Sequence, residues 1–182
     1  MIRTHILKLI NNYHPQDDAE ITYKERTLQF IEENKECFER SLESGHITAS
    51  SWLLDNTGEK ALLMHHAKLD IWCQLGGHCD GDSDVLAVAI KEAQEESGIL
   101  NILPLSQEIF DIDVHLIPAK GLIKEHFHYD IRFLLQVQSQ EQIISNRESK
   151  ELRWICSDKE KLPTKESSIT RMHEKWVKFK KN

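Results

Sequence analysis

A segment near the middle of the chain carries three glutamates that a helix would place on one face. The segment lies between Gly77 and Gly98. Its glutamates, Glu92, Glu95 and Glu96, follow the spacing i, i+3 and i+4. Like charges on one helical face repel, so this arrangement costs stability unless a positive charge lies beside it. Hard divalent cations prefer carboxylate oxygens, and the spacing therefore indicates a metal-binding helix. An acidic, solvated helix face is the alternative interpretation.

Residues 77–99 resemble the signature of the Nudix hydrolases, G-x5-E-x7-R-E-U-x-E-E-x-G-U, in which U is an aliphatic residue. Both glycines and the last three glutamates of that signature stand at matching positions. Ser83 replaces the first glutamate, and Lys91 replaces the arginine. In the family those two residues pair and brace the loop. Here Asp82 or Asp84 offers Lys91 another partner, and a phosphate contact by Lys91 is the alternative role.

The resemblance implies a set of metal ligands and a cofactor. Glu92 and Glu96 would bind Mg²⁺ or Mn²⁺, and the Gly77 carbonyl would complete the shell. Glu95 would be a further ligand, or it would act catalytically by holding a metal-bound water. The cation would stabilise charge on the phosphate and lower the pKa of the attacking water.

The general base often lies outside the signature in this family. Glu148 precedes a predicted strand, where a loop can reach the site, and it is our choice. Glu151 and Glu125 are the other carboxylates that we consider. An ordinary surface carboxylate is the alternative for each of them.

A second cluster of ionisable residues begins a predicted strand further along the chain. His126, His128 and Asp130 alternate in sequence, so they face the same side of that strand. His78 joins them if its segment passes nearby. Such a group can contact phosphate, orient a base or bind a transition metal, whereas a polar strand face is the plainest interpretation. We expect substrate contact from His78, His126 and His128.

Composition restricts the class of protein. The chain has 182 residues, of which 40% are hydrophobic and 29% are charged, and this is typical of one globular domain. Its net charge of −7 argues against a nucleic-acid polymer as partner. No apolar run approaches the ~20 residues that cross a bilayer, and no secretory signal is present. We therefore expect a cytoplasmic protein with no membrane partner.

Hydrophobic periodicity divides the chain into an N-terminal helical extension, residues 1–45, and a main domain, residues 46–182. Apolar residues recur at helical spacing from Ile2, and a second helix is predicted to begin at Thr22, with Glu25 completing a capping box.

The main domain alternates predicted strands with two predicted helices. One helix follows the glycine loop, is capped by Ser83 or Asp82 and is stopped by Gly98. The order of elements predicts an α/β (α+β) fold, a Nudix-like α/β/α sandwich with a mixed β-sheet. The strands are expected at 47–54, 60–66, 110–117, 127–137 and 151–155, and the helices at 84–97 and 167–179.

Three functions are compatible with these patterns. The first is a metal-dependent hydrolase that cleaves the diphosphate linkage of a small nucleoside-diphosphate-type metabolite. The second is a Nudix-like module that binds a nucleotide or nucleotide-sugar without turnover, which the changes at Ser83 and Lys91 motivate. The third is an isopentenyl-diphosphate-isomerase-like enzyme, for which Cys79 in the glycine loop is poorly placed as nucleophile. A homodimer is also an expectation.

Overall fold

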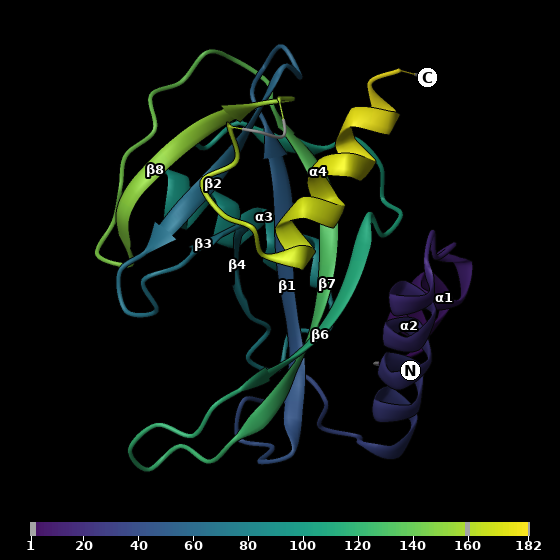
Figure 1. Cartoon of the computed structure of the whole chain (residues 1–182). Coiled ribbons are helices and arrows are strands. Elements are labelled where there is room, and N and C mark those ends of the chain that lie inside the picture. The colour runs from purple at the N-terminus through teal and green to yellow at the C-terminus, as the bar shows by residue number, and fades with distance from the viewer. Residues whose placement is uncertain (1–2, 159–160, 182) are drawn as a thin grey trace. The chain divides into compact units, whose positions relative to one another are not determined.

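The computed structural model describes residues 3–158 and 161–181 (Figure 1). The chain packs into two compact units. Unit 1 comprises Met1–Ser50, Gly76–Ala89 and Ser106–Phe133, and unit 2 comprises Ser51–Leu75, Ile90–Leu105 and Leu134–Asn182. Three elements contribute a first part to unit 1 and the remainder to unit 2: β1 (Gly45–Leu54), α3 (Val85–Ser97) and β7 (His126–Val137).

Unit 1 contains paired strands of both orientations. The antiparallel pair joins β6 (Asp111–Ile117) to the first part of β7. β1 runs in the same direction as β7, because the Phe127 amide donates to the Ser44 carbonyl and the Thr48 and Ser50 hydroxyls donate to Asp130 further along. β4 (Leu75–His78) pairs with β1. The sheet is therefore mixed, as the sequence predicts.

Two helices open unit 1 and lie side by side (Figure 1). They are α1 (Thr4–Asn12) and α2 (Asp18–Glu33). α2 packs against β6, and its Phe30 stacks on Tyr129 with ring centroids 4.0 Å apart. Ile2 lies outside the described residues.

The predicted start of the second helix was wrong. The N-cap is Asp17, whose carboxylate accepts a hydrogen bond from the Glu20 amide at 2.8 Å. Thr22 lies one turn inside the helix, where its hydroxyl donates to the Asp18 carbonyl. The helix ends at Glu33, and turns follow it.

Unit 2 is built around β2 (Lys60–His66), which pairs antiparallel with β8 (Ser149–Cys156), with the short β3 (Trp72–Cys73) and with the end of β1. A three-residue strand that the sequence did not predict, β5 (Ile102–Pro104), pairs with the end of β7. α4 (Ser167–Phe179) matches its prediction and buries its apolar side. Its Trp176 packs against Trp52 with ring centroids 6.1 Å apart.

The signature helix α3 begins one residue later than expected. Its cap is Asp84, which accepts a hydrogen bond from the Ala87 amide at 3.0 Å, and neither Ser83 nor Asp82 has that role. The helix ends at Gly98, as predicted, with φ of +73°. A Cβ at Gly98 would lie 2.7 Å from Cβ of Ile144, so only glycine fits here.

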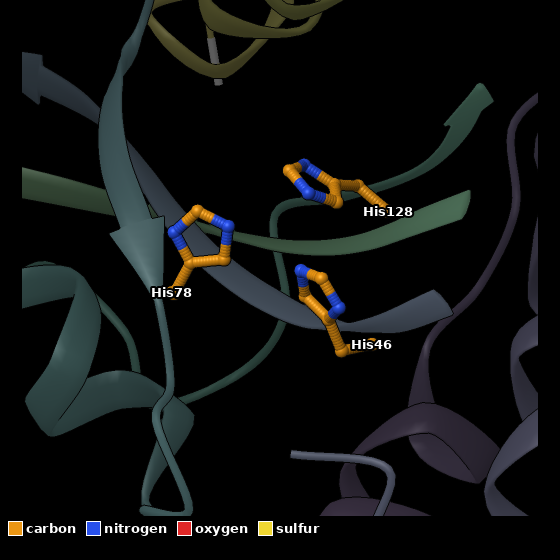
Figure 2. Close-up of side chains that lie close together, drawn as sticks. All are labelled: His46, His78 and His128. Atoms are coloured by element: carbon orange, nitrogen blue, oxygen red, sulfur yellow. The ribbon is translucent and has the colours of Figure 1, made fainter. Parts of the chain in front are cut away.

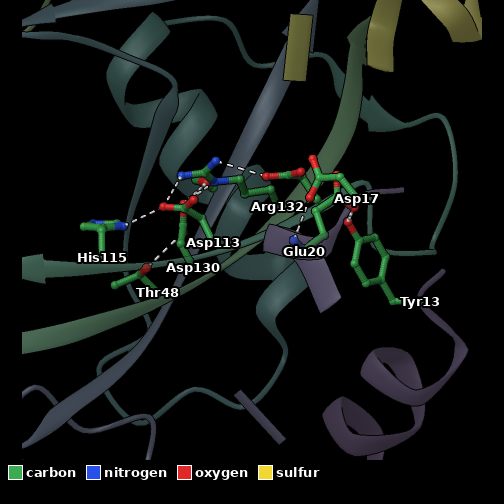
Figure 3. Close-up of polar contacts among 10 residues, drawn as sticks. Tyr13, Asp17, Glu20, Thr48, Asp113, His115, Asp130 and Arg132 are labelled. Atoms are coloured by element: carbon green, nitrogen blue, oxygen red, sulfur yellow. Dashed lines mark hydrogen bonds and ion pairs between the residues drawn. The ribbon is translucent and has the colours of Figure 1, made fainter. Parts of the chain in front are cut away.

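A buried ion network lies on the sheet of unit 1 (Figure 3). Arg132 is 1% exposed. Its guanidinium contacts three carboxylates, those of Asp130 at 2.7 Å, Asp111 at 3.1 Å and Asp113 at 3.3 Å. These carboxylates raise the pKa of Arg132 against the effect of burial. Asp130 therefore neutralises a buried arginine, whereas the sequence analysis placed it with the histidines as a possible site residue.

None of the helices in the described parts of the chain is long and apolar enough to cross a membrane. The proposed boundary between residues 45 and 46 stays a prediction.

Candidate metal and substrate site

The three glutamates of α3 lie in unit 2 and differ in exposure. We call them the glutamate face (Glu92, Glu95 and Glu96). Glu96 is buried, with 3% of its surface exposed. The side chain of Glu92 is 17% exposed, and that of Glu95 is 58% exposed. A buried carboxylate is costly unless polar or positive groups contact it. Exposure therefore decreases across the face from Glu95 to Glu96. This gradient is compatible with a cation bound near the buried Glu96.

Lys91 provides a positive charge beside this face. Its Nζ lies 3.8 Å from Oε1 of Glu92 and 3.6 Å from Oε1 of Glu95. The Lys91 side chain is 63% exposed, so these pairs add little to stability. An exposed, flexible ammonium is free to reorient towards a phosphate. The predicted brace with Asp82 or Asp84 stays a prediction.

The segment before β8 packs against the C-terminal end of α3 within unit 2. The Ile144 amide donates to the Ser97 carbonyl at 2.7 Å. The Asn146 side chain donates to the Glu95 carbonyl at 3.2 Å and accepts from the Glu148 amide at 2.8 Å. Asn146 thus joins the backbone of Glu148 to the turn of helix that carries Glu95. The sequence analysis missed Asn146, because an isolated asparagine in a loop carries no pattern.

The other two base candidates differ from Glu148 in their surroundings. Glu151 is engaged by Arg153, whose Nε lies 2.7 Å from its Oε1. Glu125 is exposed and belongs to unit 1. Glu148 is exposed, and its carboxylate acts on the neighbouring His66, whose pKa is lowered by burial and raised by that charge. The carboxylate of Glu148 is thus exposed, while its backbone is held by the hydrogen bond to Asn146.

The glycine loop lies in unit 1. Gly76 precedes Gly77 in β4, and a Cβ at Gly76 would lie 2.2 Å from Cβ of Ser50, so β4 approaches β1 closely. The loop that follows is held by an ion pair between Arg40 and Asp80. The predicted role of the Gly77 carbonyl stays a prediction.

Histidines from three strands of unit 1 converge (Figure 2). We call them the histidine cluster (His46, His78 and His128). They come from β1, β4 and β7, and one ring nitrogen from each lies within 4.8 Å of the others. The expected approach of His78 to His128 is confirmed, since their ring centroids are 5.1 Å apart. Sequence reasoning missed His46, because the strand was predicted to begin at residue 47 and a single histidine before it shows no distinctive spacing.

Two further imidazoles border the histidine cluster. The ring centroid of His126 lies 5.0 Å from that of His46, and the ring centroid of His115 lies 5.4 Å from that of His128. His126 Nδ1 donates to the Lys124 carbonyl at 2.8 Å. His115 Nδ1 lies 3.0 Å from Oδ2 of Asp113.

Burial keeps the inner imidazoles neutral. Burial, reinforced by His115, His46 and the other nearby imidazoles, lowers the pKa of His128 to about 2. Burial, with His78 and His126, likewise lowers the pKa of His46 to about 4. Neutral imidazoles are good metal ligands, whereas they offer no charge to a phosphate. This weakens the case for His128 as a direct phosphate contact.

Cys79, the cysteine of the glycine loop, is buried, with 4% of its surface exposed. Burial, together with the charges of Asp130 and Asp82, raises its pKa. A buried, protonated thiol is a poor nucleophile. The isomerase-like hypothesis therefore loses its candidate residue.

Comparison with protein-family models identifies the family of this chain. The family model described as the NUDIX domain matches residues 45–176. The chain belongs to the NUDIX family. A search of curated protein sequences found no match. The same family match supports the predicted enzyme class, a Nudix-type pyrophosphohydrolase.

Solved structures share the fold of this NUDIX chain at low sequence identity. An Ap4A hydrolase complex from C. elegans has a TM-score of 0.60 at 16% identity, over 74% of this chain and 97% of that one. A MutT protein from Methanosarcina mazei Go1 has a TM-score of 0.57 at 16% identity, over 78% and 99%. The E. coli dihydroneopterin triphosphate pyrophosphohydrolase has a TM-score of 0.55 at 14% identity, over 73% and 95%. The predicted Nudix-like fold class is confirmed.

Proposed function

We propose that this NUDIX chain hydrolyses the diphosphate linkage of a small nucleoside-diphosphate-type metabolite, with Mg²⁺ or Mn²⁺ as cofactor. The observation that carries the proposal is the glutamate face, which retains three carboxylates on one helix with Glu96 almost fully buried. Two similar structures are named an Ap4A hydrolase and a dihydroneopterin triphosphate pyrophosphohydrolase, and these names support hydrolysis of a small polyphosphate metabolite.

The residues present fit a hard cation. Glu92 and Glu96 would hold the ion through carboxylate oxygens, which Mg²⁺ and Mn²⁺ prefer, and Gly77 would add a carbonyl oxygen. The ion, when bound, supplies positive charge to the phosphate oxygens and lowers the pKa of a bound water. The partial exposure of Glu92 leaves one side of the face open to substrate.

The chain's own residues then position the substrate and move a proton. Glu148 would accept the proton of the attacking water, and Asn146 would keep its backbone next to the turn of Glu95. Glu95, which is largely exposed, would hold that water or act as the base in place of Glu148. Lys91 would turn its ammonium from the glutamates to a phosphate oxygen.

The three histidines predicted to contact the substrate, His78, His126 and His128, have a smaller part in this proposal. His126 is the best placed of them, because it is half-buried and its Nδ1 is anchored on Lys124, which leaves Nε2 to contact a substrate hydroxyl.

The test is phosphate release from a panel of nucleoside triphosphates, dinucleotides and nucleotide sugars, with Mg²⁺ or Mn²⁺ added after EDTA treatment. Glu96→Gln removes one charged ligand and should lower turnover by about 1,000-fold, equivalent to about 4 kcal/mol. Glu108→Gln, which changes an exposed carboxylate that is not part of the glutamate face, is the matched control and should keep full activity. A fully active Glu96→Gln protein would remove the metal site from this helix.

A second candidate function is binding without turnover. The observation that favours it is the pair of departures from the signature at Ser83 and Lys91. Calorimetry with the same panel separates the two functions, because tight binding of one ligand without phosphate release supports the module. Reversion of both positions, Ser83→Glu with Lys91→Arg, should then restore turnover.

Two further expectations accompany the proposal. A homodimer is tested by light scattering on the purified chain, and a cytoplasmic location by fractionation of the cells that make it.

A further inference from the structure

We propose that the histidine cluster (His46, His78 and His128) binds a divalent transition-metal cation, with Zn²⁺ as the probe, and that this ligand set is different from the glutamate face.

Three strands supply one ligand each, and their pairing fixes the positions of the ligands before a metal binds. β4 and β7 are each hydrogen-bonded to β1, so the paired backbones hold the three Cα atoms in place. The ring nitrogens already lie within 4.8 Å of one another, and Figure 2 shows the rings gathered around one space. A tetrahedral Zn²⁺ with bonds of about 2.0–2.1 Å needs its nitrogen ligands about 3.3 Å apart. Small side-chain rotations close that difference.

The inner histidines have ring nitrogens that require a partner. Among the residues that the structure describes, Nε2 of His128 has no hydrogen-bond partner, and the ring of His46 makes no hydrogen bond of good geometry, although the Leu42 backbone lies close enough to raise its pKa. His46 is only 2% exposed. Buried polar atoms are normally satisfied, and each exception needs an explanation. A cation that accepts one lone pair from each of the two rings would satisfy them both.

The choice of metal follows from the donor atoms. Imidazole nitrogen favours Zn²⁺, Cu²⁺, Ni²⁺ and Co²⁺, whereas Mg²⁺ and Mn²⁺ favour carboxylate and carbonyl oxygens. The two ligand sets of this chain therefore select different cations.

His126 borders the site as a neighbour of a bound water. Its ring centroid lies 5.0 Å from that of His46 and 5.2 Å from that of His128. Its Nδ1 donates to the Lys124 carbonyl, which directs the lone pair of Nε2 away from that bond. A carbonyl bonded to the second ring nitrogen is the usual way in which proteins orient a metal-binding histidine.

The experiment is a titration of the chelator-treated protein with Zn²⁺ by calorimetry and with Co²⁺ by visible absorption. We expect one tight equivalent and the absorption of tetrahedral Co²⁺ with nitrogen ligands. His78→Gln and His128→Gln should each weaken Zn²⁺ binding by more than about 100-fold, beyond what the loss of an outer-shell partner costs. His126→Gln should weaken it by about 10-fold. His14→Gln, a change of an exposed histidine outside the cluster, is the matched control and should bind as the parent does.

Unchanged Zn²⁺ affinity in folded His78→Gln and His128→Gln proteins overturns the proposal, and so does the absence of a tight equivalent in the parent. If these variants do not fold, imidazole ¹⁵N resonances of the unaltered protein decide. Zn²⁺ must then shift the signals of His46, His78 and His128 and leave that of His14 in place. Equal shifts throughout mean adventitious binding and also overturn it.

Glu96→Gln keeps this test independent of the proposed hydrolase. It should leave Zn²⁺ affinity unchanged while turnover falls. Loss of Zn²⁺ binding in Glu96→Gln would show that the two ligand sets act as one site and would refute the inference.

Discussion

The glutamate face and the histidine cluster, for which we propose two cation sites, are built in opposite ways. The glutamate face comes from one helix, is charged and is open to solvent at Glu95. The histidine cluster comes from three strands, is neutral and is closed around His46. The comparison teaches that a helix brings ligands together by local spacing, whereas a sheet does so only through pairing of distant segments.

The largest effect on stability is expected from the buried ion network of Arg132, which lies on the sheet of unit 1. Arg132→Met leaves three buried carboxylates without their cation. Unfolding in urea should show a loss of about 3–5 kcal/mol. Arg153→Met, at an exposed ion pair, is the control and should change stability by less than about 1 kcal/mol. Equal losses in the two variants would contradict the special role of Arg132.

The next effect is on the pH dependence of stability. It distinguishes the neutral histidine cluster from the charged glutamate face. His46 and His128 stay neutral in the folded chain down to a pKa of about 4 and about 2, whereas unfolded histidine binds a proton near its ordinary value of 6.5. Below that value the unfolded state binds more protons, so stability must fall as the pH falls from 6.5 towards 4. We expect the metal-free protein to lose about 1–3 kcal/mol in this window.

Urea unfolding at a series of pH values measures this slope, and His128→Gln is the informative variant. Below pH 6.5, the ordinary pKa of histidine, this variant should show a smaller slope of the unfolding free energy against pH. The reason is that it lacks one histidine that binds a proton only in the unfolded state. A slope as steep as that of the parent would show that other groups govern the acid sensitivity.

A smaller effect is expected at Asn146, which connects Glu148 to the glutamate face. Asn146→Ala removes one hydrogen bond to the Glu95 carbonyl and one from the Glu148 amide. Turnover should fall by about 10-fold, equivalent to the roughly 1.4 kcal/mol that such contacts contribute. Asn101→Ala, in another loop, serves as control. Unchanged turnover in Asn146→Ala would make Glu95 the preferred base.

The smallest effect on stability is expected at Lys91. Its two exposed ion pairs contribute little, so Lys91→Gln should change the free energy of unfolding by less than about 0.5 kcal/mol. If Lys91 contacts a phosphate, KM should rise while stability stays the same. Steady-state kinetics beside thermal unfolding measures both, and an unchanged KM would return Lys91 to a purely local role.

Most elements of the fold could be predicted, because their signals are local. α4 and β2 begin and end where periodicity places them, and α3 ends at the glycine that its motif requires. The start of α2 was missed because Asp17 and Thr22 both resemble N-caps, and only the folded backbone selects between them. β5 was missed because three residues show no period.

The sequence by itself determined the family, the helix that carries the glutamates and the order of strands around it. These follow from spacing within a few turns of chain, where geometry is nearly independent of the rest of the molecule. Only the tertiary structure decided that Asp130 pairs with Arg132, that Asn146 anchors Glu148, and that His46 meets two histidines from distant strands. Such contacts depend on strand pairing and burial, which bring together residues with no common local pattern.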